Sequence, residues 1–309
     1  MSLTKIEWCT ASWSPVTGCS PVSIGCQNCY AERMARRLAG RYGYPKAPNH
    51  FNVTLHPDRM DEPLRWRKPR IVFVCSMGDL FHEEVRFEWI AYILGMPRRR
   101  PQDTFIVLTK RPVRMREIIS RWNEAGWQVP SNLWLGVTAE NQATADERIP
   151  ELLPIPTAVR FVSCEPLLGP IDLRPYLKDL DWVIVGGETG PGWRYYSEDA
   201  EVTHFWLNEF IKKHGPIRVD SIKEIIFPEL WLNWVRDLRN QCKDAKVPFF
   251  FKKPPGGGKI ESDGFTLNTP DNLKIRQWPY EKGADRSQQT ADSKQPERRC
   301  RSEDKVSRH

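Results

Sequence analysis

Six short apolar runs recur along the chain, and their spacing limits the fold more than any other feature. The runs are rich in Val, Ile, Phe and Trp and read as buried strands at residues 71–75, 104–109, 133–138, 159–164, 182–187 and 247–252. Nearly continuous hydrophobicity is typical of parallel strands covered on both faces, which need long crossover connections. Several spacers have helical periodicity, at residues 30–39, 87–94, 113–125 and 230–243. The pattern predicts an α/β fold, a parallel βα-repeat barrel that is full or partial.

The length of the chain suits one such barrel. Residues 1–280 of the 309 show no second core, so we expect a single domain there, with a helical insertion at residues 205–227. Residues 281–309 contain eight Lys or Arg and six Asp or Glu but only four apolar residues. So few apolar side chains cannot offset the entropy lost on ordering, which predicts a disordered, basic C-terminal tail.

The net charge and the hydropathy of the chain indicate its cellular compartment and the kind of partner it binds. No run of about 18 uncharged apolar residues occurs, and the first residues lack a signal-peptide core, which predicts a cytoplasmic protein without membrane contact. The eight cysteines are then expected to be thiols or metal ligands, because disulfides are rare in the cytoplasm. The net charge of +7 favours an anionic partner such as nucleic acid, with Arg111 and Arg114 as the first phosphate contacts to expect.

A polar or glycine-rich segment follows five of the six runs. In a parallel α/β barrel these segments are the loops at the carboxyl ends of the strands, where binding and catalytic sites are built. The candidate residues in these loops are Ser76, Gly78, Asp79, Lys110, Glu140, Asn141, Glu165 and Glu188. We therefore expect the functional site at this edge of the sheet.

Three cysteines lie together in a loop that leads into the first predicted helix. Cys19, Cys26 and Cys29 have the spacing C-x6-C-x2-C. Three thiolates on one loop repel one another unless a metal or cluster neutralises them. One interpretation is a closed zinc site with Cys9 as the fourth ligand. The other is an iron–sulfur cluster held by three cysteines, which leaves one iron open for a small-molecule ligand and implies catalysis.

Long segments of the chain closely resemble a phage-associated, three-Cys-motif family of unassigned function. They include IEWCTASWSPVTGCSPVSIGCQNCYAERMARRL, SMGDLFHEEV, FIVLTKRPVRM, LWLGVTAENQATADERIP, VRFVSCEPLLGPIDL and DWVIVGGETGPGWR. The resemblance covers roughly residues 4–253. That family is similar to a divergent branch of the radical S-adenosylmethionine superfamily, whose fold is a full or partial βα barrel. Here six residues, rather than the usual three, separate the first two cysteines, and Asn28 replaces the aromatic residue before the third.

The resemblance implies a radical S-adenosylmethionine enzyme. The three cysteines would hold a [4Fe-4S] cluster whose open iron binds S-adenosyl-L-methionine. A 5′-deoxyadenosyl radical would then abstract hydrogen from a nucleic acid or nucleotide, in modification or repair. An electron donor such as flavodoxin or ferredoxin, and a partner protein, are implied as well. The alternatives are a non-catalytic, zinc-binding nucleic-acid-binding protein and a partner module of a phage or defence system.

The resemblance also assigns cofactor contacts to the strand ends. The methionyl ammonium group is expected at Ser76, Gly78 and Asp79. The methionyl carboxylate is expected at Lys110. The ribose hydroxyls are expected at Glu140 and Asn141.

Four further residues are candidates for chemistry on the substrate. Glu165 and Glu188 follow consecutive runs and should face the barrel mouth, where a carboxylate orients a substrate or cofactor. Cys75 and Cys164 could donate a hydrogen atom to a substrate radical if their sulfurs faced the cavity. Because neighbours on a strand face opposite ways, Cys164 and Glu165 should not both face inward unless the strand has ended.

Overall fold

The computed structural model describes residue 4 and residues 6–190, 227–255, 261–262, 265–266 and 275–279. The chain divides into two units, Met1–Pro279 and Tyr280–His309, and every described residue belongs to the first. The tail predicted at residues 281–309 lies outside the described residues. So does the insertion predicted at residues 205–227, except for Phe227, the first residue of a helix. No helix in the described ranges is long and apolar enough to cross a membrane.

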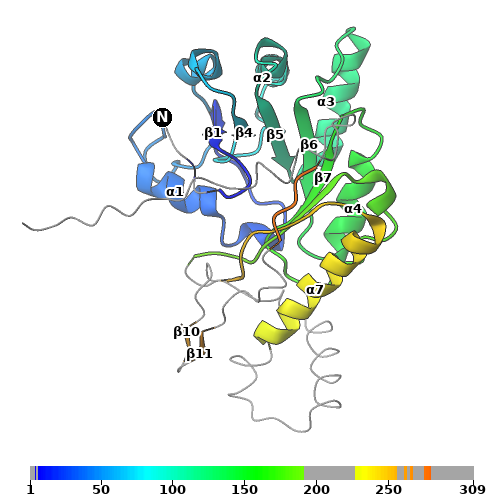
Figure 1. Ribbon diagram of the computed structural model, residues 1–309. Helices are drawn as coiled ribbons and strands as arrows, with labels where there is room; N and C mark the ends of the chain where they lie inside the picture. Colours follow the sequence, from blue (N-terminus) through cyan, green and yellow to red (C-terminus); the bar gives the residue numbers. More distant parts are fainter. Residues whose placement is uncertain are drawn as a thin grey trace, which may run out of the picture. The chain divides into compact units, whose positions relative to one another are not determined.

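Seven parallel strands form the main sheet, in the order β1-β4-β5-β6-β7-β8-β9 (Figure 1). They are β1 (Ala11–Trp13), β4 (Ile71–Val74), β5 (Thr104–Thr109), β6 (Leu133–Thr138), β7 (Arg160–Cys164), β8 (Trp182–Val185) and β9 (Phe249–Phe251). All six predicted strands are confirmed, and β1 is added at one edge. The spatial order follows the chain order, as expected for crossovers of one hand. Since β1 and β9 do not pair with each other, the described sheet is a half-barrel rather than a full barrel.

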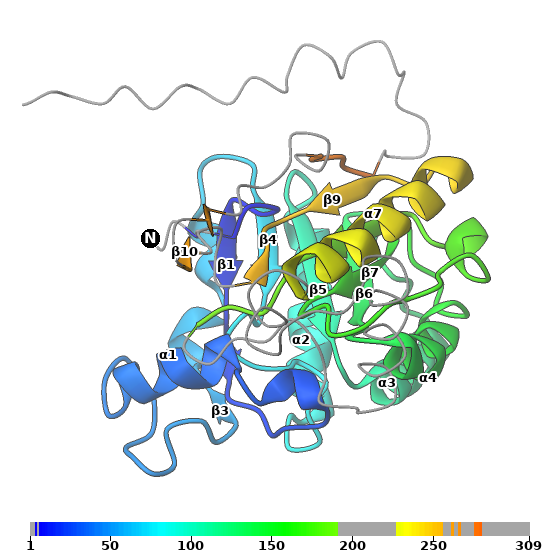
Figure 2. The ribbon, with the colours of Figure 1, turned by 90° about the horizontal axis from the view of Figure 1, so that it is seen from below.

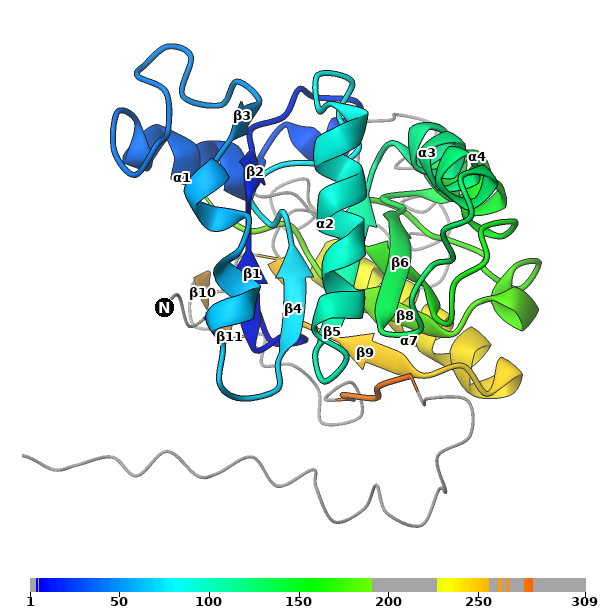
Figure 3. The same ribbon diagram turned by 90° about the horizontal axis from the view of Figure 1, so that it is seen from above.

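Helices cover one face of this sheet. They are α2 (Phe87–Arg99), α3 (Pro112–Glu124), α4 (Gln142–Leu152) and α7 (Phe227–Ala245). Viewed from above, α3 and α4 lie next to each other, and viewed from below, α7 lies next to β9 (Figures 2 and 3). Helix α1 (Tyr30–Leu38) follows the cysteine segment. Four helices match predicted ones, whereas α4 was not predicted, because only a few apolar side chains mark its buried face.

The remaining elements are short. Two antiparallel pairs are formed by β2 (Val16–Thr17) with β3 (Thr54–Leu55) and by β10 (Glu261–Ser262) with β11 (Phe265–Thr266). The 3-10 helices with bounds inside the described ranges are η1 (Ile24–Cys26), η2 (Pro57–Arg59), η3 (Glu62–Arg65) and η4 (Leu177–Asp179).

Alternation along the strands sorts the side chains between two cores. The outer core lies between the sheet and the helices, and the inner core lies on the concave face. Aromatic rings dominate the inner core, where Trp182 contacts Trp134, Phe161 and Phe250 with ring centroids 5.7–6.1 Å apart. On this concave face the aromatic side chains lie near the amino ends of the strands, and the polar side chains follow toward the carboxyl ends. Polar chemistry on the inner face is confined to the carboxyl end.

Candidate functional site

The segment with the three cysteines lies against the carboxyl edge of the sheet. We call residues 18–29 the Cys loop. This loop connects strand β2 to helix α1. Gly18 forms a parallel bridge with Gly78, which follows β4, and Gly18 N donates to Met77 O at 2.9 Å. A Cβ on Gly78 would lie 2.6 Å from Gly18 O, so only glycine permits this approach. Gly78 therefore positions the Cys loop.

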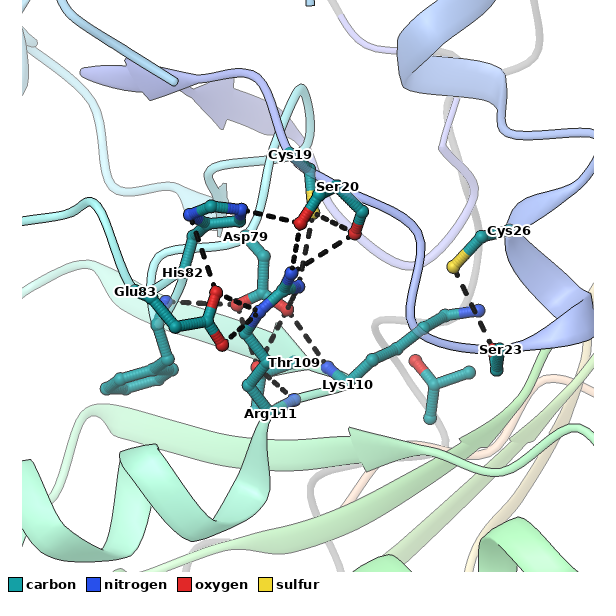
Figure 4. A network of polar contacts seen from close by, with 12 residues as sticks. Cys19, Ser20, Ser23, Cys26, Asp79, His82, Glu83, Thr109, Lys110 and Arg111 are labelled. Atoms are coloured by element: carbon teal, nitrogen blue, oxygen red, sulfur yellow. Dashed lines mark hydrogen bonds and ion pairs between the residues drawn. The ribbon is translucent and has the colours of Figure 1, made fainter. Parts of the chain in front are cut away.

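Arg111 connects the first cysteine of the loop to the end of β5 (Figure 4). Its Nη1 lies 3.3 Å from Cys19 Sγ, and its Nη2 donates to Ser20 O at 3.1 Å and to Ser20 Oγ at 2.9 Å. Only 7% of Arg111 is exposed. Its rigid fork of donors suits several acceptors at once. Arg111 thus holds a permanent positive charge beside the Cys19 sulfur.

Carboxylates hold Arg111 in place. Asp79 Oδ2 lies 3.5 Å from Arg111 Nη1, and Glu83 Oε1 accepts from Arg111 Nε at 3.0 Å. Asp79 also accepts from Thr109 Oγ1 at 2.7 Å and from Lys110 N at 3.1 Å. The oxygens of the Asp79 carboxylate are therefore already bound by hydrogen-bond donors of the protein itself. In this structure it fixes Arg111 and the segment after β5.

His82 completes this network from the loop that follows β4. Its Nδ1 accepts from Glu84 N at 3.2 Å, so Nε2 carries the proton and donates to Ser20 Oγ at 2.8 Å. Burial and the charge of Arg111 lower the pKa of His82. A neutral imidazole therefore holds Ser20 next to Cys19.

A second cation lies near the middle cysteine. Lys110 Nζ pairs with Glu140 Oε1, and Ser23 Oγ of the Cys loop donates to the same oxygen at 2.7 Å. Arg148 Nη1 donates to Glu140 Oε2 at 2.9 Å. Burial raises the pKa of Glu140, but Lys110 and Arg148 outweigh it and hold the pKa below its usual value. Glu140 is therefore a buried carboxylate that ties the Cys loop to β6 and α4.

The three thiols lie near different sources of positive charge. Burial raises the pKa of the Cys19 thiol to about 11, even with Arg111 beside it. Burial also acts to raise the pKa of Cys26, but Lys110 and hydrogen bonds within the loop outweigh it and lower the pKa. Cys29 is the N-cap of α1, where the helix dipole supplies positive partial charge. The loop is suited to negative sulfurs, although a thiolate at Cys19 needs a further cation.

The far end of the Cys loop is held by the segment after β8. Asn28 Nδ2 donates to Glu188 Oε2 at 2.9 Å, and 4% of Glu188 is exposed. The structure therefore brings Gly78, Asp79, Lys110, Glu140 and Glu188 together around one loop.

A single metal ion has no preformed site among the described residues, since no three His, Cys, Asp or Glu side chains gather there as its ligands. Cysteines of a [4Fe-4S] cluster bind different irons, so their sulfurs need not converge on one point. Cys9 precedes β1 at the amino end of the sheet and packs in the inner aromatic core, where burial raises its pKa to about 12. The strand β1 separates Cys9 from the Cys loop. A four-cysteine zinc site is therefore not assembled in this structure.

Two expected cofactor contacts make hydrogen bonds within the protein. Asn141 is the N-cap of α4, and its Oδ1 accepts from Thr144 N at 3.0 Å in a capping box. Ser76 Oγ is hydrogen-bonded to Ser12 Oγ and lies 3.5 Å from Ser14 Oγ. Ser76 thus lies in a set of three serine hydroxyls at the ends of β1 and β4. The side-chain oxygen of Asn141 instead caps helix α4.

Neither cysteine proposed as a hydrogen-atom donor faces the concave side. Cys164 is fully buried in the outer core, and burial raises its pKa well above the usual value, with Cys242 of α7 adding to the shift. Cys75 lies in the same core, where burial raises its pKa to about 12. The next residue after Cys164 faces the other way: Glu165 Oε2 accepts from Ser163 Oγ at 3.1 Å. The condition for a donor role is therefore unmet at both cysteines, while Glu165 lies on the inner face.

The sequence interpretation missed the groups that hold the loop. Arg111 was assigned to phosphate binding, but it is buried under the Cys loop, and Arg114 Nη2 donates to Val85 O at 2.7 Å. Ser20 and Ser23 carry no spacing signal, and their roles arise only from tertiary contacts. The position of Arg111 directly after a strand end was the one available indication.

A model of a protein family described as "Protein of unknown function (DUF5131)" matches residues 3–204. No curated protein and no solved structure matches the chain.

Proposed function

The chain belongs to this family of unknown function, and we propose that it is a radical S-adenosylmethionine enzyme that acts on a nucleic acid or nucleotide. Cys19, Cys26 and Cys29 would hold a [4Fe-4S] cluster at the carboxyl edge of the half-barrel. When bound, the reduced cluster supplies the electron that cleaves the sulfonium bond of S-adenosyl-L-methionine. The resemblance implies a phage-associated family, and for such a family we propose a role in nucleic-acid modification or repair.

The observation that carries this proposal is the electrostatic setting of the Cys loop. Arg111 contacts the Cys19 sulfur at 3.3 Å, Lys110 lowers the pKa of Cys26, and Cys29 stands at the N-cap position of α1. Positive charge near each sulfur stabilises thiolate ligands. The loop also lies where active sites of parallel α/β barrels are built, beyond the carboxyl ends of the strands.

The chain's own side chains would orient the cofactor around this loop. The Lys110 side chain is 19% exposed although it pairs with Glu140, so its ammonium group retains donors for the methionyl carboxylate. The hydroxyls of Ser12, Ser14 and Ser76 offer acceptors at the ends of β1 and β4. Asp79 would act indirectly, by fixing Arg111.

The test is iron and acid-labile sulfide analysis after anaerobic purification. We expect near-stoichiometric [4Fe-4S] cluster in the wild type and its loss in Cys19→Ala, Cys26→Ala and Cys29→Ala. Cys9→Ala is the matched control and should keep the cluster, because Cys9 is buried at the opposite end of β1. Tight zinc that depends on Cys9 would reject the proposal in favour of a zinc-stabilised nucleic-acid-binding protein.

A further inference from the structure

A second polar cluster lies on the same edge of the sheet, at the ends of β7, β8 and β9. Lys252 Nζ lies 2.9 Å from Glu165 Oε1, and Ser163 Oγ donates to Glu165 Oε2 at 3.1 Å. Lys253 follows directly along the chain, and its carbonyl accepts from Gly187 N at 2.9 Å.

Glycine gives the cluster its shape. A Cβ on Gly186 would lie 2.4 Å from Glu165 Oε1, so a larger residue would push the carboxylate away from Lys252. Two residues later, Glu188 contacts Asn28 of the Cys loop at 2.9 Å. The segment after β8 therefore supports both the loop and the second cluster, which places the two near each other.

The cluster has unused capacity for a ligand. The side chains of Glu165 and Lys252 are 15% and 21% exposed, so both can be reached from solvent. An ammonium group has three donors, and Glu165 occupies one donor of Lys252. Lys253 is partly buried, and within the described ranges no carboxylate lies within 4.0 Å of its Nζ. Burial and the neighbouring charge of Lys252 lower the pKa of Lys253.

We propose that Glu165, Lys252 and Lys253 bind a nucleotide, with its phosphate on the two ammonium groups and a sugar hydroxyl or base amino group on Glu165. A second carboxylate, Glu7, also acts on Lys253, but Glu7 is paired with Arg276 at 2.7 Å. The two lysines and Glu165 therefore keep an excess positive charge, which matches a phosphate. The carboxylate retains acceptor positions for a donor adjacent to that phosphate. This inference rests on the proposed function, because it names the class of substrate that the proposed enzyme would bind at the carboxyl edge of the sheet.

The experiment is calorimetric titration of the full chain carrying Cys19→Ala, which should lack the cluster. The probes are 2′-deoxyadenosine 5′-monophosphate and 2′-deoxyadenosine. We expect the monophosphate to bind at least tenfold more tightly than the nucleoside, and Lys253→Ala to remove most of that difference. Lys253→Arg should retain it, and Lys178→Ala, an exposed lysine at η4, should change nothing.

Equal binding of nucleoside and monophosphate, or equal effects of Lys253→Ala and Lys178→Ala, would overturn the inference. Melting temperatures of the variants show whether a loss of binding reflects unfolding. A ten-nucleotide single strand distinguishes the two sources of the phosphate: binding tenfold tighter than the monophosphate and dependent on Lys253 identifies a strand, and equal binding identifies a free nucleotide. Because the protein is cluster-free, failure here is separate from failure to bind iron in the wild type.

Discussion

Arg111 is the residue whose placement has the clearest chemical consequence. Its guanidinium is buried between two carboxylates and the Cys19 sulfur. Hydrogen bonds to thiolate sulfurs tune the reduction potential of an iron–sulfur cluster, because they stabilise the more negative, reduced state. Arg111 is therefore a positioning residue for the proposed cluster rather than a contact for phosphate.

Arg111→Gln should lower the reduction potential of the cluster by about 60 mV, which for one electron equals ~1.4 kcal/mol and is within the range of a charged hydrogen bond. A redox titration followed by electron paramagnetic resonance measures this. Arg114→Gln is the control, since Arg114 donates to a backbone carbonyl and not to a cysteine. Identical potentials in the two variants, at equal iron content, would show that Arg111 does not act on the cluster.

Glu140 is the residue on which the stability of the loop contact depends. Glu140→Gln removes the counter-charge of Lys110 and Arg148, and loss of one partner of a buried pair costs roughly 3–5 kcal/mol. Because the folded pKa lies below the ordinary value of 4.5, the stabilisation is complete above that pH and is lost as pH falls through the folded pKa. Urea unfolding at neutral pH and near pH 3 should therefore show a large difference from wild type that shrinks in acid. Glu151→Gln, from the surface pair with Arg116, should cost at most about 1 kcal/mol.

At the scale of elements, α1 links the Cys loop to an exposed basic surface. The helix begins directly after Cys29, and Arg36 and Arg37 in its last turn are exposed. Arg36 forms a 3.7 Å pair with Glu32 and keeps 68% of its side chain exposed. A basic helix next to the proposed cluster is complementary to an acidic electron carrier such as flavodoxin.

Reversing Arg36 and Arg37 to Glu should slow reduction of the cluster by flavodoxin at least tenfold at low salt, because charge complementarity raises association rates by 10- to 1,000-fold. Stopped-flow absorbance measures this rate. Dithionite reduction should not change, and reversal of Arg174 and Lys178, two exposed cations between β7 and β8, should leave both rates unchanged. Equal flavodoxin rates in both double variants would rule out docking at α1.

At the scale of the whole molecule, the net charge is divided between residues 1–280 and residues 281–309. Residues 281–309 contribute eight positive and six negative charges, so residues 1–280 keep +5 of the total +7. If residues 1–280 bind nucleic acid, the affinity should fall as the salt concentration rises, through release of counterions.

Deletion of residues 281–309 should leave single-stranded DNA binding within about threefold of the full chain. With about four phosphate contacts, raising the salt fourfold should weaken single-strand binding roughly 50-fold. Fluorescence anisotropy of a labelled strand measures both effects. Binding that disappears with the deleted residues would assign the interaction to residues 281–309 and leave residues 1–280 to a small-molecule substrate.

The periodicity of apolar residues was sufficient to predict six parallel strands, four of the helices and the edge of the sheet that carries polar loops, because buried strands and amphipathic helices impose local patterns. It missed β1, whose three residues are too few to form a pattern, and α4, whose buried face holds few apolar residues. Alternation along the strand predicts that Cys164 and Glu165 lie on opposite faces of the sheet. It does not say which of the two faces inward, and only the folded sheet shows this. Partners of Arg111 and Glu140 lie up to 117 positions away along the chain. Buried charges are paired by tertiary contacts that leave no periodic signal in the sequence, so only the structure could assign them.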